Sequence, residues 1–275
     1  MTALENERLN KRRAVPASQY THEELAGIYN QTRVDYIVPM PMNARRMADY
    51  VKNYDVDLDL SIVAFNDRDE EAGIGMIGMR GHRCWLTRLG VVPNNRGLRM
   101  GQYLMEAMLD KASAKGATQA QLEVIVGNEP AHNLFLKLGF EDVRKLLIVR
   151  RPPGKIEPNP VFDTFNVTEL ADGQIPYYLE QRGDNASWVE ETDSLLNTGN
   201  LRGLVVESPE GERGWVVFQR TPFQLTHFVL SPYENDTMYH ALIYHVHKTY
   251  PMQDTKIENV PEAHPRWRAY QQMGY

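Results

Sequence analysis

The chain has 275 residues, of which 42% are hydrophobic and 24% charged, a composition typical of globular proteins with room for two ordinary domains. Its one cysteine, Cys84, excludes an internal disulfide framework and indicates a reducing compartment. Apolar runs stay short of the roughly 20 residues that span a bilayer, and the charged segment 1–13 lacks the apolar core of a signal peptide. We therefore expect a cytoplasmic protein with no membrane partner.

The net charge of −6 is unevenly distributed along the chain. Residues 1–155 hold 22 Lys/Arg and 19 Asp/Glu, a net +3, whereas residues 156–275 hold 8 and 17, a net −9. An anionic ligand is therefore expected in the first part. A net +3 is too weak for a nucleic-acid surface, so no nucleic-acid partner is expected.

The first third of the chain combines helical and extended patterns. A capping box at residues 21–24 predicts the start of a helix, and a second helix is expected at 43–54. Two strand-like runs follow at 60–65 and 74–79, and a third at 84–92 ends before a proline.

The clearest helix of the chain starts at Met100, because its apolar residues recur at positions i, i+3, i+4, i+7 and i+8. Gly116 marks its end. A strand at 121–126, a helix at 131–138 and a strand-like run at 145–150 complete the first half.

The order of elements then starts again. A hairpin is predicted at 204–220, followed by a strand at 225–230 and a helix at 238–249, with a strand at 256–260 and a helix at 265–273. This order matches the second half of the first domain. The proline-rich composition of the segment between the two halves is typical of a linker. We therefore predict a domain at 1–150, a linker at 151–160 and a second, smaller domain at 161–275.

One junction is suited to holding an anion. The segment from Val91 to Gly101 runs from a strand end, through a glycine-containing turn, into the helix that starts at Met100. Such a junction directs backbone N–H groups and the positive end of a helix at one point, which suits a pyrophosphate. Arg96 and Arg99 can add charge-assisted contacts. Many similar junctions bind nothing, so the loop alone leaves both interpretations open.

A second motif decides between them. The segment Asn128–Phe140 (NEPAHNLFLKLGF) follows the strand Leu122-Glu123-Val124 at the expected distance from the loop. Together the two segments resemble the GNAT superfamily of N-acetyltransferases, whose signature is V-x-P-x-x-R-G-x-G-x-G followed by N-x-x-A-x-x-L-Y-x-K-x-G-F. The resemblance covers roughly residues 14–150.

The resemblance implies both a fold and a reaction. The fold is an α/β structure with a mixed, splayed sheet and helices on both faces. The reaction transfers an acetyl group from acetyl-CoA, as cosubstrate, to a primary amine by direct attack. In that family the loop amides hold the pyrophosphate and the strand end pairs with pantetheine, which an asparagine of the second motif also contacts. The cofactor-binding residues implied here are Val91, Val92, Arg96, Gly97, Leu98, Arg99, Met100, Gly101, Asn128 and Phe135.

Two residues depart from the family pattern. Arg99 replaces the middle glycine of the loop, which backbone binding tolerates if its side chain points outward. Phe135 replaces a tyrosine whose phenol protonates the leaving thiolate in many members. A thiol with a pKa near 8.5 that leaves as thiolate near pH 7 costs only about 2 kcal/mol, so the loss is tolerable.

Deprotonation of the amine is the harder step. An amine with a pKa of about 10.4 is more than 99% protonated at neutral pH, so a base must remove the proton. Glu123 is the candidate catalytic base, since in the ribosomal-protein alanine acetyltransferases, which this segment resembles, the carboxylate at this position has that role. The alternative is a glutamate on the strand face paired with an arginine.

Two further patterns are better explained by packing than by binding. The run Gly73–Gly78 spells GxGxxG, but no strand precedes it and no helix opens on it, so we expect a glycine-rich central strand rather than a dinucleotide site. His240, His245 and His247 lack the i, i+4 pairing of a metal site and have no cysteine nearby, so no metal is expected. The apolar loop at 36–42 either borders the acceptor groove or serves ordinary packing.

The second domain resembles a degenerate GNAT unit. The stretch Ser231–Thr237, at the position of the phosphate loop, has no glycine, lysine or arginine and has two carboxylates that would repel a pyrophosphate. We expect the second domain to shape the acceptor groove or to form an oligomer contact, as in a homodimer. Two questions stay open: whether the acceptor is a small amine or a protein N-terminus or lysine, and whether the chain is instead a non-catalytic module that senses CoA or acyl-CoA.

Overall fold

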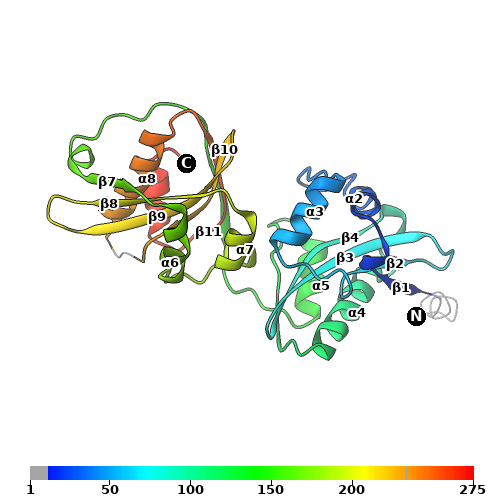
Figure 1. Ribbon diagram of the computed structural model, residues 1–275. Helices are drawn as coiled ribbons and strands as arrows, with labels where there is room; N and C mark the ends of the chain where they lie inside the picture. The colour runs from blue at the N-terminus through cyan, green and yellow to red at the C-terminus, as the bar shows by residue number, and fades with distance from the viewer. Residues whose placement is uncertain (1–11, 233–234) are drawn as a thin grey trace. The chain divides into compact units, whose positions relative to one another are not determined.

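The computed structural model describes residues 12–232 and 235–275, and the chain divides into two units, Met1–Asp142 and Val143–Tyr275. Both are α/β units, each with one mixed sheet (Figure 1). Most of the charged N-terminal segment and two residues of the acidic stretch, Tyr233 and Glu234, lie outside the described residues. Within the described ranges, no helix has the length and apolar character required to cross a membrane.

The sheet of unit 1 has five strands in the same order in space as in sequence. The first four pair antiparallel with their neighbours, and the last pairs parallel. The strands are β1 (Arg13–Pro16), β2 (Ile62–Phe65), β3 (Glu71–Arg80), β4 (Arg83–Val91) and β5 (Gln119–Gln121). The predicted strands at 60–65, 74–79 and 84–92 are thereby confirmed within a few residues.

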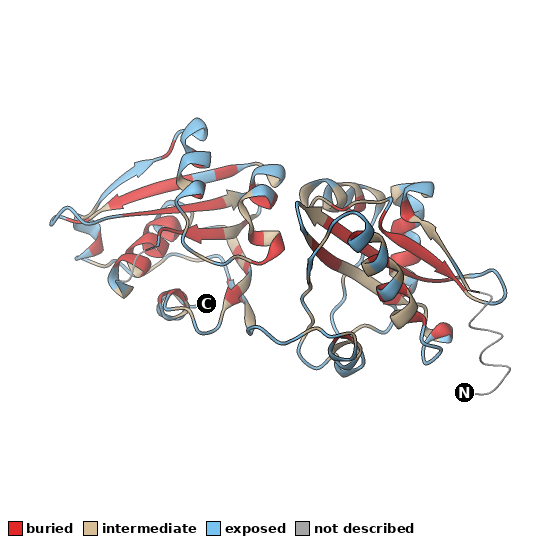
Figure 2. Ribbon diagram, turned by 90° about the horizontal axis from the view of Figure 1, so that it is seen from below, coloured by how far each residue is buried: buried red, intermediate tan, exposed pale blue. Residues whose placement is uncertain are grey.

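Helices cover both faces of this sheet. The pair α2 (His22–Gln31) and α3 (Ala44–Asn53) packs on one face, and α4 (Met100–Ala114) with α5 (Glu129–Lys137) packs on the other. Figure 2 shows the buried strands between these helix layers. The predicted capping box starts α2, because the Thr21 hydroxyl accepts from the Glu24 amide while the Glu24 carboxylate accepts from the Thr21 amide.

The GxGxxG run lies in β3, as the sequence predicts for a central strand. A Cβ added at Gly75 would lie 2.4 Å from the Met108 methyl carbon, and one at Gly73 would lie 2.7 Å from the Gly90 carbonyl oxygen. These glycines therefore let α4 and β4 lie close against the centre of the sheet.

Unit 2 repeats this plan. Its strands are β7 (Asn166–Glu169), β8 (Leu201–Glu207), β9 (Arg213–Arg220), β10 (Gln224–Leu230) and β11 (Asp254–Pro261), and they pair in sequence order, antiparallel up to β10 and parallel between β10 and β11. The short helices α6 (Ile175–Glu180) and α7 (Thr192–Thr198) pack on one face, and α8 (Asp236–Thr249) and α9 (Arg266–Gln272) pack on the other. The two units therefore share one order of strands and helices.

One strand lies elsewhere than the sequence suggests. Residues 145–150 are expected at the end of the first domain, but β6 (Leu146–Arg151) pairs antiparallel with β11 at the edge of the second sheet. The boundary between the units therefore falls between Asp142 and Val143 rather than at residue 150. The pairing satisfies the outer backbone groups of β11, which would otherwise form an open edge.

The segment expected to be a linker, 151–160, also belongs to unit 2. The Gly154 amide donates to the Pro251 carbonyl at 2.8 Å, and the Arg151 guanidinium donates to the Met273 carbonyl at 2.9 Å. Ile156 packs against the core under α8 and α9. The prolines of this segment therefore lie along a domain surface instead of separating two domains.

The histidines of α8 face the core of unit 2. His245 and His247 are buried; His245 bonds the Phe162 carbonyl, and Nε2 of His247 lies 2.7 Å from the Tyr275 hydroxyl. His240 packs edge-on against the Phe162 ring. In the described part of the chain, no group of three or more His, Cys, Asp or Glu residues is placed to hold a metal ion.

Burial of His247 predicts a pH dependence of stability. Desolvation, with repulsion from Arg151, lowers the pKa of His247 from 6.5 to about 3. Between these values the folded unit keeps the ring neutral while the unfolded chain takes up a proton, so stability falls as the pH falls through this window, by about 1.4 kcal/mol per pH unit at most.

Between pH 6 and pH 4.5 we expect the unfolding free energy of His247→Gln to fall by about 2 kcal/mol less than that of the wild type, since the variant has no imidazole to protonate on unfolding. Denaturant unfolding of the full chain at both pH values measures the difference. His82→Gln, which removes an exposed histidine, is the comparison. Parallel stability curves for wild type and His247→Gln would contradict the prediction.

Candidate active site

The sheet of unit 1 opens between its two last strands. β5 pairs with β4 only from Arg83↔Gln119 to Trp85↔Gln121, although β4 continues to Val91. Residues 122–126, which the sequence predicts to extend the strand, lie outside the ladder. From Leu86 onward β4 therefore pairs with no described strand on this side, and its edge is open to a ligand with hydrogen-bonding groups.

A β-bulge bends β4 within this open stretch. The register against β3 shifts between Ile74 and Met76, and Arg88 takes the left-handed conformation with φ of 50°. Beside it, the Thr87 hydroxyl lies 2.5 Å from the hydroxyl of Tyr50 on α3. Bulges are over-represented next to active sites, where they redirect side chains.

The loop from β4 to α4 has the backbone of an anion site. Gly97 has φ of 77°, and Arg99, the N-cap of α4, has φ of 57°, so the arginine has a left-handed backbone conformation that glycine adopts more readily. No side chain caps this helix, and its first turn has no acidic residue. The N–H groups at the start of α4 therefore keep their positive potential for a ligand.

Arg96 has partners within the protein. Its guanidinium forms a bidentate ion pair with Asp35, at 2.6 and 2.8 Å, and also donates to the carbonyls of Val91 and Thr32. This contact lowers the pKa of the Asp35 carboxyl, mainly through the hydrogen bond from Arg96. The exposed loop is thus attached to the end of α2, and a second arginine, Arg12, donates to the Leu98 carbonyl.

The proposed base, Glu123, lies on the segment that leaves β5. Its carboxylate is exposed and accepts a hydrogen bond of 2.7 Å from the indole nitrogen of Trp85. Trp85 in turn packs against Tyr50 and Tyr54 of the α3 region, with ring centroids 6.0 Å apart in both pairs. The carboxylate is therefore held on the α2–α3 side of the sheet.

The two residues predicted from the second motif have different environments. Asn128 precedes α5, and its side-chain amide donates to the Tyr36 hydroxyl at 3.3 Å. Phe135 is 7% exposed and packs edge-on against Phe140 in the core beneath α4, with ring centroids 6.1 Å apart. Phe135 thus has a packing role in this structure, whereas Asn128 is half-buried and bonded to Tyr36.

Part of unit 1 matches a known protein family. Residues 26–140 match the model of the acetyltransferase (GNAT) family. No curated protein matches the sequence. Residues 26–140 form a GNAT domain.

Solved structures show that the likeness extends over both units. A GCN5-related N-acetyltransferase from Sphaerobacter thermophilus is 15% identical with a TM-score of 0.70, over 96% of this chain and 92% of that one. A tandem GNAT protein from the clavulanic acid biosynthesis pathway is 13% identical with a TM-score of 0.61, over 96% and 94%. A GCN5-related N-acetyltransferase from Anabaena variabilis is 15% identical with a TM-score of 0.55, over 90% and 66%. At these identities the comparisons show the fold of the two-unit chain.

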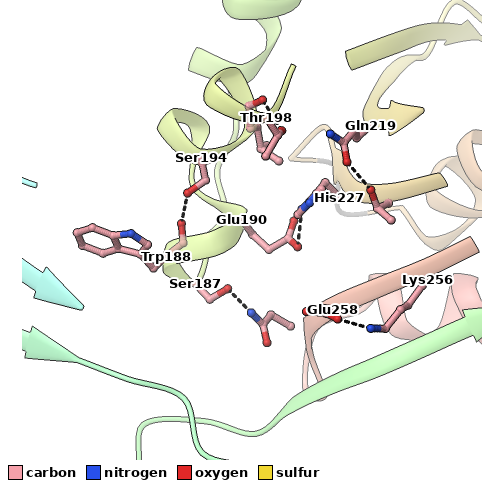
Figure 3. Close-up of polar contacts among 12 residues, drawn as sticks. Ser187, Trp188, Glu190, Ser194, Thr198, Gln219, His227, Lys256 and Glu258 are labelled. Atoms are coloured by element: carbon pink, nitrogen blue, oxygen red, sulfur yellow. Dashed lines mark hydrogen bonds and ion pairs between the residues drawn. The ribbon is translucent and has the colours of Figure 1, made fainter. Parts of the chain in front are cut away.

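Unit 2 reproduces the bulge of the GNAT domain. The sequence LTRLGVVP at 86–93 aligns without gaps to LTHFVLSP at 225–232, and His227 has φ of 55° at the position of Arg88. The register between β10 and β9 shifts at this point. Nδ1 of His227 lies 2.9 Å from the Glu190 carboxylate (Figure 3), which helps to raise the pKa of the buried imidazole against the desolvation that would lower it. This repeat is the signal that would have identified the bulge from the sequence.

The helix that follows the bulge differs between the units. The Asn235 side chain caps α8 by accepting from the Thr237 amide at 2.8 Å, and Asp236 adds a negative charge in the first turn. Asp236 also pairs with Arg268 at 3.1 Å. The positive end of α8 is therefore already satisfied, whereas that of α4 in the GNAT domain is uncapped.

The sequence pattern did not indicate the side chains around the Arg88 bulge. Tyr29 and Tyr50 come from α2 and α3, and Arg33 follows α2, so only the folded chain brings them to β4. Of the predicted residues, the loop 96–101 lies at the start of α4, and Glu123 and Asn128 lie on the segment that diverges from β4. Phe135 lies apart from them in the core.

The left-handed Arg99 predicts an unusual order of stabilities. A side chain with a Cβ costs roughly 1–2 kcal/mol in this conformation, whereas glycine adopts it readily. We therefore expect Arg99→Gly to be more stable than Arg99→Ala by about 1 kcal/mol, measured by denaturant unfolding.

The neighbouring Leu98 provides the matched control. Leu98 is exposed, and its φ is not positive. Leu98→Gly should therefore be less stable than Leu98→Ala. The same order at both positions would show that residue 99 does not have the left-handed backbone in solution.

Proposed function

We propose that the GNAT domain binds acetyl-CoA, once per chain, and transfers the acetyl group to a primary amine by direct attack. The observation that carries the proposal is the uncapped start of α4, which directly follows the open edge of β4. A cofactor with a pyrophosphate at one end and an amide-containing arm at the other matches this order, with the pyrophosphate at the start of α4 and the arm along the edge of β4. The negative ligand also fits a loop flanked by Arg12, Arg96 and Arg99.

The assignment of individual contacts follows the chain. The amides of Gly97 to Gly101 would hold the pyrophosphate, and Arg96 and Arg99 would add charge. The end of β4, at Val91 and Val92, would pair with the pantetheine arm. The side-chain amide of Asn128 would bind the same arm.

The reaction then needs one proton acceptor. The amine nitrogen attacks the thioester carbonyl carbon, the C–N bond forms, and the C–S bond breaks to release CoA as a thiolate. Glu123 would take the proton from the amine, directly or through water. Phe135 has no hydroxyl group for the thiolate and lies in the core, so the thiolate would leave unprotonated at a cost of about 2 kcal/mol.

Unit 2 would be the degenerate member of the tandem. The capping of α8 by Asn235, with Asp236 in its first turn, supports the absence of a second acetyl-CoA site. We propose that unit 2 shapes the acceptor groove or forms a homodimer, and that the protein is cytoplasmic.

The second candidate function is a non-catalytic module that senses CoA or acyl-CoA. The substitution of Phe for the family tyrosine at residue 135 favours it. Thioester turnover with a panel of amines separates the two, since binding without turnover supports the sensor. The same panel, extended to peptides, tests whether the acceptor is a protein N-terminus or lysine.

Arg96 and Asp35 test the phosphate site as a matched pair. Arg96→Ala should weaken acetyl-CoA binding by about 1.5–3 kcal/mol, the usual range for a hydrogen bond to a charged group. Asp35→Asn breaks the same ion pair but keeps the positive charge of Arg96, so the loss of acetyl-CoA affinity in this variant should be smaller. Calorimetry on the full chain measures both affinities and the stoichiometry, expected to be one.

Each alternative result has a distinct meaning. Equal losses in the two variants would show that the ion pair only holds the loop in place. Unchanged affinity in Arg96→Ala, or two sites per chain, would contradict the proposed site.

Glu123 tests the chemical step. Glu123→Gln keeps the size of the side chain and can still accept a hydrogen bond from Trp85, but it cannot take up a proton at neutral pH. Turnover should fall by about 10²–10⁴, the usual contribution of a general base, while acetyl-CoA affinity stays the same. The pH profile of kcat/KM should lose its ascending limb.

Trp85→Phe is the control for positioning. It removes the donor to Glu123 and leaves the carboxylate, so it should reduce turnover less than Glu123→Gln and keep the ascending limb. Near-normal turnover in Glu123→Gln would place the base elsewhere, while leaving the cofactor site intact.

A further inference from the structure

We propose that the acceptor amine of the GNAT domain carries a carboxylate, and that Arg33 and Arg88 bind this carboxylate beside the bulge of β4. The inference rests on the proposed acetyl transfer and names its substrate class, a small amino acid rather than a protein lysine. Four observations carry it: the placement of the two arginines, their few partners, the lack of an ion pair with a described carboxylate, and the nearby Glu123.

Arg88 lies at the centre of an aromatic cluster. Its guanidinium carbon is 4.1 Å from the Tyr50 ring centroid and 5.4 Å from that of Tyr29. In the described part of the chain it makes one hydrogen bond, from Nη1 to the Tyr29 hydroxyl at 3.1 Å. Its Nε is buried without a partner. The Nε donor of Arg88 is therefore unused.

Arg33 brings a second positive charge to the same cluster. Its guanidinium carbon is 4.0 Å from the Tyr36 ring centroid and 5.1 Å from that of Tyr29. It donates to the Leu89 carbonyl, next to the bulge, at 2.7 Å, and its Nε too is buried without a partner. Both guanidinium groups thus border the ring of Tyr29.

No described carboxylate forms an ion pair with either arginine. Asp35, two residues after Arg33, is engaged in the bidentate pair with Arg96, and neither Arg33 nor Arg88 forms an ion pair in the described ranges. Two half-buried like charges are unfavourable unless they are paired, and tyrosine faces offset only part of that cost. A carboxylate matches the fork of a guanidinium and supplies the missing negative charge.

The proposed base borders the same cluster. Tyr50, on which Arg88 stacks, also packs against Trp85, which donates to Glu123. A small amino acid could therefore place its amine toward Glu123 and its carboxylate toward Arg88 and Arg33. A protein lysine side chain has no carboxylate of its own to offer there.

Matched acids and amides test the substrate class. The full chain is assayed with acetyl-CoA and with glycine, β-alanine and 4-aminobutyrate, each against its amide, and with phosphoethanolamine. We expect the acid of at least one pair to exceed its amide in kcat/KM by tenfold or more, as a charged contact predicts. A phosphate ester that exceeds every carboxylate would overturn the assignment.

Variants then assign the preference to residues. Arg88→Gln and Arg33→Gln should each reduce the ratio of acid to amide in kcat/KM by tenfold or more, mainly by raising KM for the acid, with affinity for acetyl-CoA unchanged. Arg45→Gln, which removes a fully solvated arginine of α3, should leave the ratio as in the wild type. Circular dichroism spectra that match the wild type show that a variant is folded.

The outcomes separate this inference from the proposed function. No turnover of any amine, with acetyl-CoA bound, would remove the proposed function itself. Turnover of acids and amides at equal kcat/KM in the wild type would overturn this inference alone, whether or not the variants fold. A loss of acetyl-CoA affinity in Arg88→Gln would assign the arginines to the cofactor phosphates and also overturn it.

Discussion

The features of the candidate site depend on one constraint, the separation of β5 from β4 after three paired residues. Up to Trp85 and Gln121 the two strands satisfy each other's backbone groups, and beyond that point β4 continues without a partner on this side. An unpaired edge inside a fold is costly unless a ligand or solvent satisfies it. The bulge at Arg88 bends this same stretch, and the loop to α4 begins where it ends. The proposed cofactor site and the proposed acceptor side of the sheet therefore both depend on the stretch of β4 after Trp85, which is paired on a single side.

The two units share a scaffold and differ at the start of one helix. Both have the same strand order, the same parallel last pair and a left-handed residue at the bulge, Arg88 or His227. The difference lies in the first turn of the next helix. The start of α4 has a left-handed Arg99 and no capping side chain, whereas Asn235 and Asp236 satisfy the start of α8. Because the scaffold is maintained by burial, a few polar residues at a helix terminus are enough to decide whether an anion can bind there.

Local rules in the sequence predicted most of the first unit, and contacts between distant residues account for what they missed. The helix at Met100 and the capping box at Thr21 follow from short-range periodicity and hydrogen bonding, and both were found. The pairing partner of β6 cannot be predicted in this way, because residues 145–150 do not indicate which sheet edge is open. That edge belongs to β11, about a hundred residues later. The extent of β5 was overestimated because residues 122–126 have strand composition but diverge from β4. The arginines at the bulge were missed because their partners, Tyr29, Tyr36 and Tyr50, lie on other elements.

The two sides of the candidate site differ in what holds a ligand, and this difference bears on how specificity arises. On the proposed cofactor side the groups are mainly backbone amides, which any residue with the right φ supplies; an arginine can therefore stand at position 99. On the proposed acceptor side the groups are side chains of Arg33, Tyr50 and Arg88. A family that keeps one cosubstrate and varies its acceptors would be expected to show this division. The identity of the acceptor is therefore to be sought in the side chains around the bulge rather than in the motifs that identify the family.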